Sequence, residues 1–187
     1  MDGMDNHGDF VYELGMLRRI RREGWRLAGI DTPESVAAHA LRAAQIGYLL
    51  ACMEDYEQPA EVAAMLVFHD MGECRIGDVH KVANRYIDAD EAAAVEDQCS
   101  GLDKSGECIL ALWRRYETGS DGGNIARDAD LLEMAATARE HVAAGYTDAK
   151  EWLDAIEPRL CTTAGRRLFE ALLDTEPHAW WQGLKKL

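Results

Sequence analysis

The spacing of apolar residues is the feature that most constrains the fold of this chain. Alanine, leucine and glutamate recur with helical spacing along the sequence, while runs in which β-branched and polar residues alternate are nearly absent. The predicted fold class is therefore all-α. A chain of 187 residues is long enough for one well-packed domain and short for two. We expect a single domain over residues 1–187, completed by helices in 148–187.

Start and stop signals divide the chain into helices. Thr32 places a capping hydroxyl before Pro33, a residue type favoured at the first helical position, and Pro59 opens the next helix in the same way. The segment 21–31 reads as an irregular connector, and the glycines of 118–124 indicate a flexible loop. The expected helices are 10–20, 33–53, 59–70, 88–98, 104–116, 125–144, 148–156, 162–173 and one from 177 onward.

Composition excludes several classes of protein. A formal net charge of −14 would repel the backbone of a long nucleic acid, so no extended nucleic acid is expected as a partner. Five cysteines without CxxC spacing argue against a disulfide framework and against a thiolate zinc site. No uninterrupted apolar run approaches the ~20 residues of a membrane span, and the first residues do not resemble a signal peptide. We expect no membrane partner and a cytoplasmic location.

The string VFHDMGE contains His69 and Asp70 side by side. Neighbouring helical residues point about 100° apart, so the two can share a metal ion only near a helix end. Gly72 indicates such an end. A His-Asp pair alone is also explained by a buried histidine beside a capping aspartate.

Two more segments change this interpretation. ESVAAHALRAA supplies His39, and RDADLLEMA supplies Asp128 and Asp130. The order His, His-Asp and a distant Asp resembles the HD-domain phosphohydrolase superfamily. The strings RREGWRLAGIDTPESVAAHALRAA, MLVFHDMGECRIGDVHKVANRYI and IARDADLLEMA are similar to elements of its 5′-deoxynucleotidase-like branch. The resemblance covers about 17–133 and implies a helical bundle with a metal site between helices.

The resemblance implies that one divalent cation is bound by His39, His69, Asp70 and Asp130. Two nitrogens and two oxygens leave open positions for phosphate and water, and they suit manganese, iron, cobalt, nickel or zinc, with magnesium also open. Asp128 competes for the last ligand position. Spacing to the following Leu-Glu favours Asp130 in the family pattern.

Two further acids follow the His-Asp pair. Glu73 lies three residues after Asp70, so both carboxylates occupy nearly the same face of a continued helix. The resemblance implies that Glu73 orients or deprotonates the attacking water and that Asp78 contacts substrate or water. The alternative is an exposed helix end.

The substrate is expected to meet a local concentration of positive charge. LRRIRREGWR concentrates five arginines in an otherwise acidic chain. Arg22 is the candidate for gripping phosphate, and Trp25 for a flat face against a base or sugar. A solvated helix face with a core tryptophan is the alternative. His80 and Lys81 are second choices at the pocket mouth, where a surface pair is the commoner outcome.

The favoured function is hydrolysis of a nucleoside monophosphate, with a deoxyribonucleotide included, to nucleoside and phosphate. A cyclic nucleotide, an alarmone or a nucleoside triphosphate is an alternative substrate, and a non-catalytic metal-binding interaction protein is an alternative class. One departure from the family, ETGSDGGNI, alters the loop before Asp130 and bears on pocket width. Trp180 and Trp181 are expected to cover apolar surface on the body or in an interface, and a homodimer is predicted.

Overall fold

The fold is all-α, as predicted. The computed structural model describes residues 4–184, and no strand is found among them. An isolated antiparallel bridge joins Arg21 to Ser35. The α-helices of the described part are α1 (Met4–Leu14), α2 (Val36–Met53), α3 (Pro59–Phe68), α4 (Glu73–Ile76), α5 (Glu91–Cys99), α6 (Asp103–Thr118), α7 (Asp121–Ala143), α8 (Lys150–Ile156) and α9 (Thr163–Asp174).

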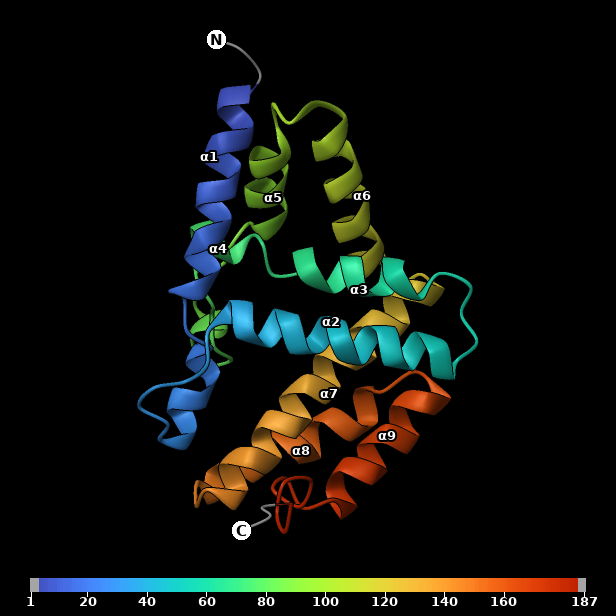
Figure 1. Ribbon diagram of the computed structural model, residues 1–187. Helices are drawn as coiled ribbons and strands as arrows, with labels where there is room; N and C mark the ends of the chain where they lie inside the picture. Colours follow the sequence, from blue (N-terminus) through green and yellow to red (C-terminus); the bar gives the residue numbers. More distant parts are fainter. Residues whose placement is uncertain (1–3, 185–187) are drawn as a thin grey trace.

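The helices lie in three tiers (Figure 1). α2 and α3 cross the middle, α1, α5 and α6 stand on one side of them, and α8 and α9 lie on the other. The 23-residue α7 runs from the middle tier into the lower one and packs on α2, α3, α6, α8 and α9. The main hydrophobic cluster is built around α2, α3 and α7, and a smaller one lies between α1, α5 and α6.

α2 is the central helix. It has the length and mean hydropathy, 1.2, of a membrane-crossing helix by composition alone. Its position against α3 and α7 accounts for that composition, because small residues let it approach both helices closely. A Cβ atom at Gly47 would lie 2.3 Å from Leu66 Cδ1 and 3.2 Å from Val62 Cγ1.

The start of α2 differs from the prediction. Ser35, not Thr32, is the cap: its backbone is extended, and its hydroxyl accepts a hydrogen bond from Ala38 N at 3.2 Å. The preceding segment pairs with 20–22, since Arg22 N donates to Glu34 O and Val36 N donates to Ile20 O. Those main-chain bonds hold 33–35 outside the helix. Pro59 does begin α3, as predicted.

The predicted flexible loop over 118–124 is wrong. α6 continues to Thr118, and α7 begins at Asp121 after a turn at Gly119 and the capping residue Ser120, whose hydroxyl accepts from Gly123 N at 3.2 Å. Two glycines of the string lie inside the first turn of α7, where space is short. A Cβ atom at Gly122 would lie 2.7 Å from Tyr56 Oη, and one at Gly123 would lie 2.3 Å from the carbonyl oxygen of Arg115.

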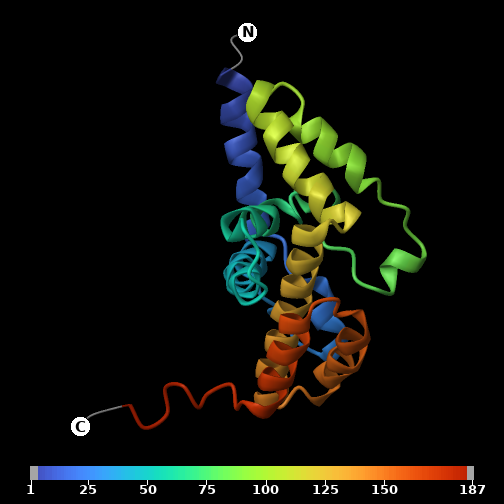
Figure 2. The same ribbon diagram turned by 90° about the vertical axis from the view of Figure 1, so that its right-hand side faces the viewer.

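Both ends of the chain also depart from the predicted helices. α1 ends at Leu14 and passes into a 3₁₀ turn, Gly15–Arg18, instead of covering 10–20. The helix expected from 177 is absent: the described residues there form turns and run away from the bundle (Figure 2). Proline disfavours a helical conformation in the residue before it, so Pro177 accounts for the end of α9 at Asp174 and not for the absence of a helix after it. Trp180 is 77% exposed, so the tryptophan pair does not cover the body.

Candidate functional site

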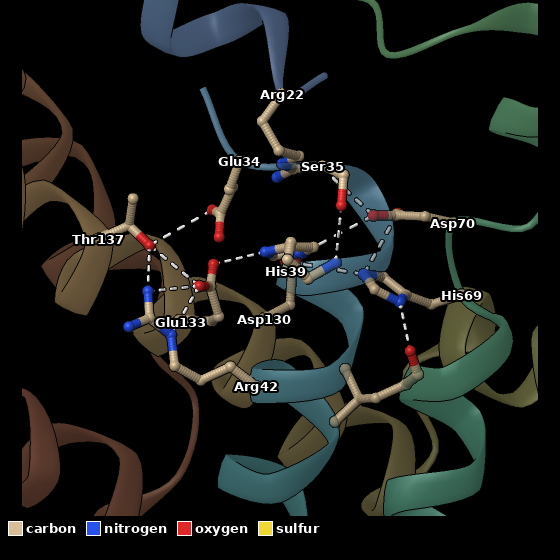
Figure 3. Close-up of polar contacts among 12 residues, drawn as sticks. Arg22, Glu34, Ser35, His39, Arg42, His69, Asp70, Asp130, Glu133 and Thr137 are labelled. Atoms are coloured by element: carbon tan, nitrogen blue, oxygen red, sulfur yellow. Dashed lines mark hydrogen bonds and ion pairs between the residues drawn. The ribbon is translucent and has the colours of Figure 1, made fainter. Parts of the chain in front are cut away.

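His69 and Asp70 lie at a helix end, as their proposed shared ligation requires. α3 ends at Phe68, and the chain then turns into the short helix α4, with Glu73 N donating to Asp70 O at 3.1 Å. The turn is crowded, because a Cβ atom at Gly72 would lie 2.7 Å from Glu91 Cγ. This geometry brings the two adjacent side chains toward one centre, and Figure 3 shows them side by side.

The ring of His69 is oriented by the main chain. Its Nδ1 donates to the carbonyl oxygen of Leu66 at 2.8 Å, and Trp113 Nε1 donates to the carbonyl oxygen of His69 at 3.1 Å. With Nδ1 protonated, Nε2 carries the lone pair. That nitrogen is buried and has no hydrogen-bond partner among the described residues; it lies 3.2 Å from Asp70 Oδ1.

The ring of His39 reaches the same centre from α2. Its Nδ1 donates to Glu133 Oε2 at 2.5 Å, which turns Nε2 toward the other acids. Nε2 lies 3.0 Å from Asp130 Oδ1 and 3.7 Å from Asp70 Oδ2. It too is buried without a hydrogen-bond partner in the described part of the chain.

The predicted ligands fit a divalent cation. One ligand atom from each of His39, His69 and Asp70 lies within 4.8 Å of the others. Asp130 joins them, with Oδ1 also 3.8 Å from His69 Nε2, and its other oxygen accepts from the Tyr116 hydroxyl at 3.0 Å. Two buried imidazole nitrogens with lone pairs facing carboxylates form the donor set that borderline divalent ions prefer.

The electrostatics of this centre favour positive charge. Burial and the Arg22 charge lower the pKa of His39, but Asp130 and Glu133 outweigh them and raise it to about 10. Burial opposes ionisation of Asp130, yet the neighbouring rings of His39 and His69 hold its pKa well below the usual range. The carboxylates of Asp130 and Glu133 therefore stay ionised and stabilise positive charge at the centre, either a proton on the His39 ring or a divalent ion in its place.

The two acids of α7 have separate surroundings, although they stand two residues apart. Asp128 is fully buried and accepts from Cys161 N at 2.9 Å, Thr162 N at 2.7 Å and the Thr162 hydroxyl at 2.6 Å. It therefore fixes the chain that leads into α9. Asp130 lies instead with His39, His69 and Asp70, and these four residues are called the metal group below. The geometry therefore separates the two candidates that the sequence left competing.

Arg22 connects the three acids that follow His69. Its Nη1 nitrogen lies 3.3 Å from Asp70 Oδ2, 3.4 Å from Asp78 Oδ1 and 3.9 Å from Glu73 Oε1. Asp78 also accepts from the backbone nitrogen of Glu23 at 2.5 Å, which ties the start of a 3₁₀ turn, Glu23–Ala28, to the site. The structure thus places the predicted phosphate-binding and catalytic residues together at one edge of the metal group.

Glu73 binds a proton more tightly than an ordinary carboxyl group. Its Oε2 is buried and has no hydrogen-bond partner among the described residues. Burial and the charge of Asp70 raise its pKa to about 9, although Arg22 lowers it. A carboxyl group that binds a proton near neutral pH is suited to general acid–base chemistry.

The remaining substrate candidates border a small cavity of about 160 Å³ next to Arg22. Trp25 is only 2% exposed and packs against Trp152, with ring centroids 5.0 Å apart, so most of its indole belongs to the core. His80 Nδ1 accepts from a backbone nitrogen at 3.2 Å, and Lys81 Nζ lies 2.6 Å from Glu151 Oε1. All three line the cavity but already have partners within the protein.

Two residues beside His39 have a role that the sequence did not predict. Glu133 accepts the Nδ1 proton of His39, and Arg42 donates to Glu133. Each lies three residues after a predicted ligand, Arg42 after His39 and Glu133 after Asp130. That spacing puts each on the same helical face as its ligand and is the one signal that the sequence contains.

An HD-domain sequence profile matches residues 14–163. The chain belongs to the HD-domain family. The 5′-deoxynucleotidase HDDC2 of Danio rerio is 30% identical over 144 residues, which are 74% of this chain and 70% of that one. The protein of the same name from Dictyostelium discoideum is 27% identical over 74% of this chain and 78% of its own length. A structural-genomics crystal structure superposes with a TM-score of 0.80 at 32% identity, covering 95% of this chain and 99% of the other.

This HD-domain chain is a phosphohydrolase, similar to relatives that are named 5′-deoxynucleotidases. HD-domain membership and the buried histidine–carboxylate group together imply a divalent metal.

Proposed function

We propose that the protein is a 5′-nucleotidase that hydrolyses deoxynucleoside 5′-monophosphates to nucleoside and inorganic phosphate. The observation that supports this most is the adjacency of two sets of residues. His39, His69, Asp70 and Asp130 form a donor set for one divalent ion, while Arg22 and Glu73 border the same centre. The names of the relatives support the substrate class.

The site contains residues suited to a metal ion, to a phosphate group and to a water molecule. When bound, the divalent ion supplies a Lewis acid that polarises the phosphate and acidifies a water molecule. Arg22 supplies a guanidinium that pairs with phosphate oxygens, and Asp78 holds it at the edge of the site. Arg22 would thereby offset part of the negative charge of the phosphate ester.

Glu73 handles the proton in this scheme. As the oxygen of water forms its bond to phosphorus, its proton passes to the carboxylate of Glu73. As the bond between phosphorus and the 5′ oxygen breaks, that oxygen takes this proton from Glu73 and leaves as the alcohol of the nucleoside. The raised pKa of Glu73 lets it hold the proton between these two events.

A substrate panel tests the proposal. Deoxynucleoside and ribonucleoside 5′-monophosphates, 3′-monophosphates, cyclic nucleotides, an alarmone and triphosphates would each be assayed for hydrolysis with manganese, cobalt, nickel, iron, zinc or magnesium. The fastest release of phosphate should come from deoxynucleoside 5′-monophosphates. His69→Ala, prepared in parallel, controls for contaminating phosphatase. Faster cleavage of another class would replace the proposed substrate, and metal binding without any hydrolysis would favour an interaction protein.

Arg22→Ala separates binding from chemistry. Because Arg22 is assigned to the phosphate, its loss should raise KM by about tenfold or more, on the scale of one charged hydrogen bond, and change kcat less. Steady-state kinetics measure both constants. An unchanged KM would remove Arg22 from substrate binding.

We also propose that the protein is a homodimer. α2 carries an exposed apolar stripe at helical spacing, formed by Leu41, Tyr48, Leu49 and Met53, and Trp180 and Trp181 form a second exposed group. Sedimentation or light scattering tests this: a mass of 20.8 kDa at every concentration would contradict it. Leu49→Glu and Trp181→Glu, compared in the same assay, decide which group forms the contact.

A further inference from the structure

A chain of side chains extends behind His39, on the side away from the metal group. Glu133 accepts the Nδ1 proton of His39 on Oε2 at 2.5 Å. Its other oxygen, Oε1, accepts from Arg42 Nε at 2.9 Å and from Arg42 Nη2 at 2.8 Å. Figure 3 shows the three residues in line, with Arg42 at the far end.

The carboxylate of Glu133 is fixed on every side. It is fully buried, and the Thr137 hydroxyl also donates to Oε1 at 2.9 Å. A buried carboxylate costs several kcal/mol unless a cation and hydrogen bonds compensate for its lost hydration. Arg42 supplies that charge through two donors, so without Arg42 the carboxylate of Glu133 would keep only His39 and a hydroxyl as donors, beside the second carboxylate of Glu34.

The direction of the Nδ1 bond decides what His39 presents to the metal group. A neutral histidine that donates from Nδ1, the form that can ligate a metal, keeps its lone pair on Nε2. Nε2 is the atom that lies 3.0 Å from Asp130 and has no hydrogen-bond partner among the described residues. A shift of Glu133 would free the ring to rotate or to exchange tautomers, and both changes would take the lone pair away from the metal position.

We propose that Arg42 is a positioning residue of the metal site: acting through Glu133, it holds His39 in the orientation and tautomer that present Nε2 to a divalent ion. This rests on the metal site that the proposed function uses, but not on the choice of substrate. Neither Arg42 nor Glu133 touches the reacting atoms in this scheme.

A second cation site behind His39 is the competing interpretation. Ligand atoms of Glu34, His39 and Glu133 lie within 4.8 Å of one another. However, the Nδ1 proton of His39 already points at Glu133, and the guanidinium of Arg42 already neutralises the other oxygen. A side-chain cation therefore takes the place that an ion would need.

Glu140 offers a matched control on the same network. It accepts from Arg42 Nη1 at 2.7 Å, the guanidinium nitrogen that does not bind Glu133, and its side chain is 45% exposed. Glu140→Gln removes one ion pair of Arg42 and leaves the bonds between Arg42 and Glu133 in place. Metal affinity should therefore fall in Glu133→Gln and stay nearly unchanged in Glu140→Gln, even if both glutamates contribute to stability.

The experiment measures zinc and cobalt binding to the full chain by competition with a chromophoric chelator, without nucleotide. Glu133→Gln should weaken metal affinity about 10- to 100-fold, the usual range for a residue that orients a ligand. Arg42→Met should weaken it about tenfold, Arg42→Lys should recover part of the loss, and Glu140→Gln should stay within about twofold. The absorption spectrum of bound cobalt should shift in the first two variants and not in Glu140→Gln.

A double variant keeps the test decisive if Arg42→Met folds poorly, because Arg42→Met/Glu133→Gln removes the buried carboxylate together with its guanidinium partner. If Arg42 acts through Glu133, the double variant binds metal no more weakly than Glu133→Gln alone. Fully additive losses would overturn the proposal, as would an affinity of Glu133→Gln within twofold of the original protein. Thermal unfolding of each variant is measured beside its metal affinity. A loss of metal affinity in Glu140→Gln as large as that in Arg42→Met would show that the role of Arg42 is purely structural. Because no substrate is present, failure of this proposal stays distinct from failure of the proposed nucleotidase activity.

Discussion

The two histidines of the metal group are held in different ways. His69 follows the end of α3, and its Nδ1 donates to a carbonyl oxygen only three residues earlier. His39 lies inside α2, and its Nδ1 donates to Glu133, 94 residues later on α7. The first arrangement forms with the local backbone, whereas the second forms only when α2 and α7 pack. The orientation of His69 should therefore withstand side-chain substitutions elsewhere in the site better than the orientation of His39.

Removing either ring tests whether both halves are needed. His39→Ala and His69→Ala should each lose bound metal, because three remaining ligands form too weak a site. Metal analysis of the purified variants measures the loss. His141→Ala is the control, since that histidine packs against Trp25 outside the metal group. Full retention of metal in both ligand variants would refute the proposed donor set.

The two acids of α7 sharpen the comparison on the side of His39. Asp128→Ala should keep its metal and lower the free energy of unfolding by about 3 kcal/mol, because three buried donors lose a charged acceptor. Asp130→Ala should do the reverse, losing metal at a smaller cost in stability. Denaturant titration and metal analysis of both variants measure the two effects, and the opposite pattern would exchange the roles of these residues.

Glu73→Gln probes the chemistry on the side of His69. The amide nearly preserves shape but cannot take the proton of water, so turnover should fall about a hundredfold while metal stays bound. Single-turnover kinetics with metal-loaded protein measure the rate. An unchanged rate would remove Glu73 from catalysis.

The smallest effect is expected at Trp113, which donates to the carbonyl oxygen of His69. Trp113→Phe removes this bond and should cost about 1 kcal/mol or somewhat more of stability. Metal affinity should change less than about threefold, because the carbonyl oxygen of Leu66 still orients the ring. A loss of affinity as large as that of Glu133→Gln would erase the contrast between the two histidines.

The sequence predicted the part of this molecule that local patterns encode. Helical spacing predicted the fold class, and motif order predicted four residues that the structure brings to one centre. The pairing of Arg42 with Glu133 spans 91 residues and depends on how two helices pack, so no local pattern contains it. Thr32 was predicted as the cap because Pro33 follows it. Main-chain hydrogen bonds between its segment and residues 20–22 place the start of the helix after Ser35 instead.

The glycines of 118–124 misled for a related reason. In a sequence, a glycine is usually interpreted as a position of conformational freedom. Gly123 is needed for a different reason: a Cβ atom there would lie 2.3 Å from the carbonyl oxygen of Arg115, so no side chain fits. The same crowding affects Gly122. From the sequence alone, a glycine needed for its backbone angles and one needed for close packing look identical.

Gly123 also bears on how natural variation in this chain should be interpreted. A residue that never varies is usually credited with binding or catalysis, but position 123 should tolerate glycine alone because the end of α6 leaves no volume for a side chain. A mutational scan of the first turn of α7 would therefore find an intolerant position whose variants misfold, in contrast to ligand variants that fold and lose only the ion. Insertions meant to redesign the substrate pocket belong at Gly119, where the chain already turns with φ +65°, and not at the two glycines that follow.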